Sequence, residues 1–179
     1  MVSSVYHAIG ASRQIFIQAP TGVGKTMSTI FPAVRAVGEG KGETIFYLTA
    51  KTITRTVAQE AFEVLREKGM KYKVVTITAK EKLCFMDETK CDPVHCPYAR
   101  GHFDRVNDAV YELWTTKSRY DRETIREQAE KWQVCPFEMC LDLSVWVDAV
   151  ICDYNYVFDP TVHLKRFFRG KYFRGSYFF

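Results

Sequence analysis

Residues 19–26 read Ala-Pro-Thr-Gly-Val-Gly-Lys-Thr, which is the pattern of a phosphate-binding loop. Glycines at 22 and 24 permit backbone angles that a side chain would disfavour, so that their N–H groups can turn toward phosphates. The lysine is expected to reach the β- and γ-phosphates of a nucleotide, and the last threonine to place its hydroxyl on Mg²⁺. The predicted nucleotide-binding residues are Thr21, Gly22, Val23, Gly24, Lys25 and Thr26, with Lys25 and Thr26 as the catalytic pair.

The residues around this loop alternate between strand-like and helix-like patterns. Residues 15–18 are expected to form a short buried strand before the loop, and 25–37 a helix after it. Further strands are expected over 43–49, 73–78 and 146–152, with a helix over 54–68. The order strand, helix, strand, helix, strand predicts right-handed crossovers and an α/β fold with a parallel sheet.

The alternation is interrupted between residues 81 and 141. Residues 84–98 contain three cysteines and two prolines with little periodicity, and 102–133 are expected to form two helices, with Asp121 as a possible N-cap. The sequence therefore predicts a first α/β part over 1–80, an inserted and mainly helical domain over 81–141, and a return to the α/β domain over 142–179.

Four cysteines in the interrupted region are candidate metal ligands. Cys84, Cys91 and Cys96 lie close together in sequence, and Cys135 follows the helical pair, which would bring it back to them. Four thiolates suit either a [4Fe–4S] cluster or Zn²⁺, and their spacing does not separate these two. Cys140 is an alternative fourth ligand, and four buried thiols without a metal are the structural alternative.

Two histidines and one further cysteine are not among the four candidate metal ligands. His95 and His102 are expected to be solvated loop residues, with a role as metal ligands as the alternative, and Cys152 is expected to belong to the core.

Composition limits the class of protein. Hydrophobic residues make up 47% of the chain and charged residues 26%, which is typical of a globular protein with a core. No apolar stretch approaches the roughly 20 residues that span a bilayer, and no secretory signal is visible, so we expect no membrane partner and a cytoplasmic location. The net charge of +4 permits a nucleic-acid partner without requiring one.

Three stretches together resemble the XPD/DinG family of superfamily 2 DNA helicases. They are the loop with the preceding Gln18, the segment Tyr47-Leu-Thr-Ala-Lys-Thr52, which is similar to the family's motif Ia, and the cysteine-bearing insertion together with the strand-like segment after it. The insertion runs into Cys135-Pro-Phe-Glu138 and then Val150-Ile-Cys-Asp-Tyr-Asn-Tyr-Val-Phe-Asp-Pro160. The resemblance covers essentially the whole chain.

The resemblance implies a RecA-like first motor domain of an ATP-dependent DNA helicase, with an iron–sulfur domain inserted in it. It implies 5′→3′ translocation on single-stranded DNA, unwinding of forked DNA with a role in DNA repair, and a monomer that uses ATP and Mg²⁺. The implied ligands of the [4Fe–4S] cluster are Cys84, Cys91, Cys96 and Cys135, and the implied DNA-backbone contacts are Thr49, Ala50, Lys51 and Thr52. Threonine hydroxyls and a lysine at a strand end also suit phosphate contacts on chemical grounds.

The sequence departs from the family pattern in two respects. The family carries an Asp-Glu-Ala-His box after the Asp-Tyr-Asn-Tyr segment and then a second motor domain, and these 179 residues contain neither. We therefore expect a fragment of a longer helicase, which alone binds nucleotide weakly and hydrolyses almost none. The alternatives are a non-enzymatic nucleic-acid-binding module with a structural Cys₄ metal site, and an iron–sulfur redox protein with an incidental nucleotide site.

Overall fold

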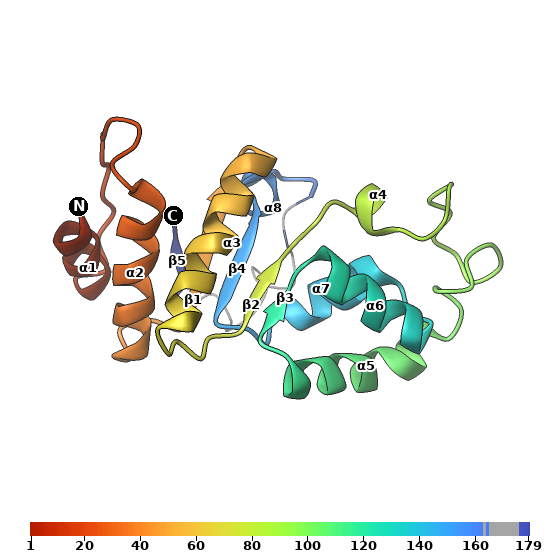
Figure 1. Ribbon diagram of the computed structural model, residues 1–179. Helices are drawn as coiled ribbons and strands as arrows, with labels where there is room; N and C mark the ends of the chain where they lie inside the picture. The colour runs from red at the N-terminus through yellow and green to blue at the C-terminus, as the bar shows by residue number, and fades with distance from the viewer. Residues whose placement is uncertain (163, 165–175) are drawn as a thin grey trace. The chain divides into compact units, whose positions relative to one another are not determined.

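The computed structural model describes residues 1–162, 164 and 176–179, and the chain forms two compact units (Figure 1). The first unit comprises Met1–Tyr72 and Asp148–Phe179, and the second comprises Lys73–Val147. Each unit has strands that pair in parallel and helices packed around them.

Three parallel strands form the centre of the first unit. Strand β1 (Thr44–Thr49) pairs with β4 (Ala149–Asp153) along one edge and with β5 (Ser176–Phe178) along the other. Ile45 and Phe46 of β1 are fully buried although they point to opposite faces, as in a parallel sheet that is covered on both sides. Burying each such side chain stabilises the fold by about 1.5–3 kcal/mol.

Helices α2 and α3 both pack against β1, and α1 packs on α2. Helix α2 turns Ile30, Ala33 and Ala36 into the core, where each is fully buried. The helices of this unit are α1 (Val2–Gly10), α2 (Lys25–Gly38), α3 (Thr52–Glu67) and α8 (Asn155–Phe158).

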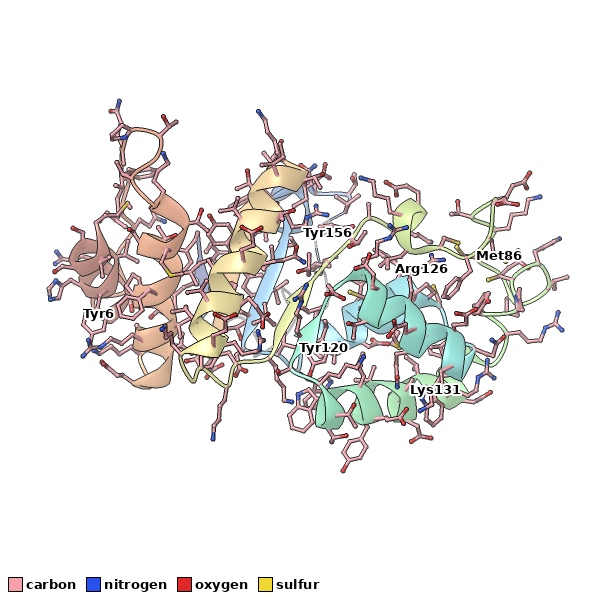
Figure 2. All side chains as sticks on the ribbon, in the orientation of Figure 1. Tyr6, Met86, Tyr120, Arg126, Lys131 and Tyr156 are labelled. Carbon is pink, nitrogen blue, oxygen red and sulfur yellow. The ribbon has the colours of Figure 1, made fainter. Side chains whose placement is uncertain are left out.

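The second unit is mainly helical. Its strands β2 (Val74–Thr76) and β3 (Arg119–Tyr120) form a short parallel pair, and the Tyr120 side chain, labelled in Figure 2, is completely buried. Its helices are α4 (Lys80–Leu83), α5 (His102–Thr116), α6 (Arg122–Trp132) and α7 (Pro136–Ser144). Helices α5, α6 and α7 pack against one another, so they supply the core of this unit.

Polar contacts cap α6 and hold it against α5. The Asp121 carboxylate accepts a hydrogen bond from the N–H of Thr124 at 3.0 Å, which caps α6. Glu112 on α5 accepts hydrogen bonds from Gln128, Lys131 and Trp132, at 2.9, 2.5 and 2.6 Å. One carboxylate therefore ties α5 to three residues of α6.

The predicted α/β fold with parallel strand pairing is confirmed, as are the two helices within 102–133 and the cap at Asp121. The strand expected over 15–18 is wrong: this segment has no regular structure, and Phe16 is 95% exposed. Both edges of β1 are paired with β4 and β5, so this segment does not pair with β1, and its apolar side chains are exposed rather than packed in the core. Helix α7 was not expected. Within the described residues, no helix is both long enough and apolar enough to span a membrane.

Candidate functional site

The glycine-rich loop has the backbone that its sequence predicts. Gly22 and Gly24 have φ values of 82° and 70°, in the left-handed region that favours glycine. Gly24 is the N-cap of α2, which begins at Lys25, so the loop leads directly into a helix N-terminus. No side chain caps this helix, and its first N–H groups and its dipole are therefore suited to binding an anion.

Lys25 lies folded back on its own loop. Its ammonium donates to the carbonyl oxygens of Pro20 and Ala19, at 2.8 and 3.2 Å. The side chain of the next residue, Thr26, lies 3.4 Å from the hydroxyl of Tyr47, which connects the helix start with β1. The predicted Lys25 and Thr26 are thus adjacent at the helix start, while the residues Thr21–Gly24 are exposed.

A cavity of about 970 Å³ lies beside the loop, within the first unit. Lys25 and Thr29 of α2 and Tyr47 of β1 line it, together with the exposed segment Ile15–Ile17. Its size is at the upper end of the range found for small-molecule sites, and the lysine supplies a cation at its wall. The sequence did not indicate this cavity, because its wall comes from segments far apart in the chain.

The four predicted DNA-contacting residues lie in two different environments, one of them buried and three exposed. Thr49 is 2% exposed, and its hydroxyl donates to the carbonyl oxygen of Cys152 at 3.4 Å. This side chain therefore lies inside the sheet, where it cannot contact DNA. Ala50, Lys51 and Thr52 are exposed where β1 passes into α3. Lys51 is the N-cap of α3 without a side-chain capping bond, so a lysine and a helix N-terminus are presented at the same place.

All four predicted cysteine ligands line one cavity in the second unit. Cys84 follows α4, Cys91 and Cys96 lie in the long loop before α5, and Cys135 is the N-cap of α7. The cavity is small, with a volume of about 30 Å³. In the part of the chain that the structure describes, no three His, Cys, Asp or Glu side chains are placed to hold a single metal ion.

The pKa values of the groups around this cavity are shifted by burial and by hydrogen bonds. Lys80 also lines the cavity, and a hydrogen bond with Cys91 is the main cause that raises the pKa of this lysine. Burial raises the pKa of the Cys135 thiol, whereas hydrogen bonds from the N–H groups of Glu138 and Phe137 at the start of α7 lower it. A metal group would therefore have to displace the Cys135 proton, with the helix N-terminus assisting.

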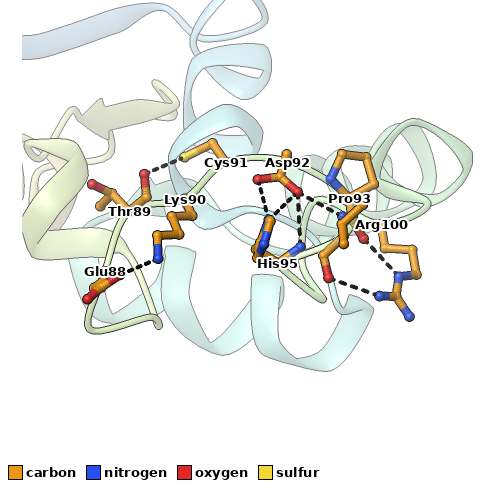
Figure 3. Close-up of polar contacts among 9 residues, drawn as sticks. Glu88, Thr89, Lys90, Cys91, Asp92, Pro93, His95 and Arg100 are labelled. Carbon is orange, nitrogen blue, oxygen red and sulfur yellow. Dashed lines mark hydrogen bonds and ion pairs between the residues drawn. The ribbon is translucent and has the colours of Figure 1, made fainter.

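The loop around Cys91 and Cys96 is ordered by its own polar contacts, as Figure 3 shows. The Asp92 carboxylate accepts hydrogen bonds from the backbone N–H groups of Val94 and His95, at 2.9 and 3.0 Å, and contacts the His95 ring at 2.8 Å. Arg100 donates to the carbonyl oxygens of Pro93 and Val94. These contacts fix the turn between two candidate ligands.

The structure also places Cys140 and both histidines, and of these three only His102 differs from expectation. Cys140, the alternative ligand, is completely buried in α7 and does not line the cavity, and burial raises its pKa to about 12. His102 is not a solvated loop residue: it is 4% exposed, and its Nδ1 accepts a hydrogen bond from the N–H of Cys135 at 3.2 Å. Periodicity could have indicated its burial, since it precedes Val106 and Ala109 on one face of α5. His95 is exposed, and Cys152 is buried in β4, as expected.

Comparison with known protein families agrees with the glycine-rich loop. A family model described as DEAD/DEAH box helicase matches residues 3–99, which is more than half of the 179 residues. The chain belongs to the DEAD/DEAH box helicase family. The match includes the loop, the segment at the end of β1 and three of the four candidate cysteines.

Membership of the DEAD/DEAH box helicase family assigns a general activity. Such a domain uses ATP and Mg²⁺, belongs to an enzyme that hydrolyses ATP, and works on nucleic acid. The α/β fold with parallel strands agrees with a RecA-like helicase domain. No curated protein sequence gives a significant match to the chain.

Proposed function

We propose that this DEAD/DEAH box helicase chain works in a DNA helicase of the XPD/DinG type, which couples ATP hydrolysis to 5′→3′ translocation on single-stranded DNA and unwinds forked duplexes. One observation carries the proposal: a single cavity is lined by all four candidate ligands, Cys84, Cys91, Cys96 and Cys135. This cavity belongs to the second unit, whereas the phosphate-binding loop belongs to the first. A nucleotide loop and a four-cysteine unit in one chain are the combination that distinguishes this helicase type from others in the family.

The first unit would bind the nucleotide. Transfer of the γ-phosphoryl group to water depends on positioning and on neutralising charge, rather than on covalent chemistry by the protein. The N–H groups around Gly22 and Gly24 would surround the phosphates, and Lys25 would exchange its bonds to Ala19 and Pro20 for the β- and γ-phosphates. The Thr26 hydroxyl would be a ligand of Mg²⁺, which supplies positive charge at the transferred group.

The exposed residues after β1 would hold the DNA backbone. Lys51 would pair with a phosphate, and the N–H groups at the start of α3 would bind the same or a neighbouring phosphate. Thr52 is exposed beside them and can donate its hydroxyl, and Ala50 leaves the backbone accessible. Contacts of this kind recognise the strand without reading its bases, as translocation requires.

The four cysteines of the second unit are a donor set that suits an iron–sulfur cluster. Four thiolates are the ligands of a [4Fe–4S] cluster. The four cysteines line one cavity, although no three metal-binding side chains among the described residues are placed for one ion. Zn²⁺ also takes four thiolates, so it is the resemblance to the XPD/DinG type that makes [4Fe–4S] the preferred group and Zn²⁺ the alternative. When bound, the cluster would crosslink the loop to α7.

Binding measurements on the 179-residue chain test this function. We expect the chain to bind an ATP analogue and single-stranded DNA, Lys25→Ala to abolish nucleotide binding only, and Lys51→Ala to weaken DNA binding only. Anaerobic reconstitution with iron and sulfide is expected to give a brown protein. A colourless protein that binds zinc and DNA but no nucleotide would instead support a non-enzymatic binding module. Polarity is tested by comparing duplexes with a 5′ or a 3′ single-stranded tail as substrates of the helicase.

A further inference from the structure

One arginine from α6 contacts the backbone of the first candidate ligand. Nη1 of Arg126 donates to the carbonyl oxygen of Leu83 at 2.6 Å and to that of Cys84 at 3.2 Å. Figure 2 labels Arg126 on α6 and Met86 on the loop that follows Cys84. Cys84 is thereby tied to a helix that lies about 40 residues further along the chain, and this bond concerns its backbone, so the thiol stays available.

The same guanidinium also supports the cavity wall. Its central carbon lies 4.4 Å from the centre of the Phe85 ring, and that ring lies 4.6 Å from the ring of Tyr98. Cys84, Phe85 and Tyr98 all line the cavity. Since Tyr98 comes two residues after Cys96, the contacts from Arg126 to Phe85 and from Phe85 to Tyr98 connect the surroundings of two candidate ligands.

A second arginine on the same helix provides an internal comparison. Arg122 lies one turn before Arg126 and donates from Nε to the carbonyl oxygen of Lys82 at 3.0 Å. Neither arginine lines the cavity itself, but Cys84 and Phe85, which Arg126 contacts, do line it, whereas Lys82 does not. The two arginines therefore make similar bonds to the same stretch of backbone, but only Arg126 contacts a cysteine and the aromatic wall.

We propose that Arg126 is a positioning residue for the metal group that the four cysteines bind. It holds the Cys84 backbone and the Phe85–Tyr98 pair in place, so that the first ligand is oriented before the group arrives. The planar guanidinium is suited to this role, because it donates to carbonyl oxygens in its plane and stacks on an aromatic ring with its face. This proposal rests on the proposed function, since it requires that the four cysteines bind a metal group.

The test compares four forms of the 179-residue chain after anaerobic reconstitution with ferrous iron and sulfide: wild type, Arg126→Met, Arg126→Lys and Arg122→Met. The measurements are iron and sulfide bound per chain, the rate of iron release to a chelator, and the electron paramagnetic resonance spectrum of the reduced protein. Loss of an outer-shell partner typically lowers metal affinity by about 10–100-fold, so Arg126→Met is expected to release iron at least about tenfold faster than wild type.

Arg126→Lys keeps the charge and the alkyl chain but loses the fork and the planar face, so its rate is expected to be intermediate. Both Arg126 variants are expected to shift the resonance spectrum, which reports the geometry around the iron. If Arg126→Met does not fold, Arg126→Lys carries the test. Arg122→Met is expected to match wild type in rate and spectrum.

The outcomes separate this proposal from the proposed function. Equal iron release and unchanged spectra in wild type and both Arg126 variants would overturn the role of Arg126 and leave the cysteine site intact. Faster release in Arg122→Met to the same degree would also overturn it, because the effect would then be a general one of α6. A wild-type chain that takes up neither iron nor Zn²⁺ would overturn the cysteine site and this proposal together, whereas nucleotide binding by the first unit is measured independently.

Discussion

The backbone N–H of Cys135 donates a hydrogen bond to Nδ1 of His102 at 3.2 Å, so that the starts of α5 and α7 are joined. His102 is buried, and its Nδ1 can accept only while it carries no proton. The neutral ring with its proton on Nε2 is therefore the form that fits this contact. The bond places the most distant candidate ligand beside the loop that contains the other three.

Replacing His102 is expected to destabilise the second unit. His102→Leu would leave the Cys135 N–H without this acceptor, which costs about 1–3 kcal/mol when the group is buried. His102→Asn keeps a side-chain acceptor and should lose less. Urea unfolding followed by circular dichroism measures the difference between wild type and each of the two variants. Equal stability of His102→Leu and wild type would show that this hydrogen bond contributes nothing.

The left-handed backbone of the phosphate loop is expected to require glycine at position 24. A Cβ there would meet no atom within 4 Å, so the effect of Gly24→Ala comes from backbone strain alone, at about 1–2 kcal/mol. We expect weaker binding of an ATP analogue, measured by titration, and a lower unfolding midpoint. Gly10→Ala is the control, because Gly10 lies in α1 with an ordinary helical backbone. An unchanged affinity in Gly24→Ala would argue against the predicted phosphate contacts.

Lys51 and Thr49 are expected to behave differently although they are two residues apart. Lys51→Ala should weaken single-stranded DNA binding and reduce the slope of log affinity against log salt by about 0.7, the value for one contact to a single strand. Thr49→Ala should lower stability and leave DNA affinity unchanged, because Thr49 is buried. Lys68, exposed at the far end of α3, gives the matched control Lys68→Ala. A Lys68→Ala effect as large as that of Lys51→Ala would indicate only general charge attraction.

Acid stability is expected to depend on Glu112. Hydrogen bonds from Lys131, Trp132 and Gln128 lower the pKa of this carboxyl from 4.5 to about 2. A carboxylate whose pKa is lower in the folded state stabilises the fold fully above pH 4.5, and this stabilisation is lost as the pH falls toward 2. Glu112→Gln should therefore show a shallower loss of stability over this range, measured by urea unfolding at several pH values. Parallel curves for the two proteins would contradict the prediction.

The parallel strands, the helix after the glycine-rich loop and the cap at Asp121 were predictable from sequence because each depends on residues that are neighbours in the chain. Left-handed glycines and helix caps act over a few residues, and alternating strands and helices specify their connections. The prediction of a strand over 15–18 was wrong because strand formation depends on residues that are far apart in the chain. Its apolar residues suit a strand, but a strand also needs pairing and burial by distant segments, which local sequence does not reveal.

The sequence by itself determined the phosphate loop, the α/β class and the set of cysteines worth considering, since residue type and spacing specify this chemistry. Only the tertiary structure decided that Cys135 lines the cavity while Cys140 is buried in the core, that Thr49 lies inside the sheet, and that Arg126 reaches Cys84. The physical reason is that burial and long-range hydrogen bonds depend on which distant segments pack together, and this follows from the fold of each unit as a whole.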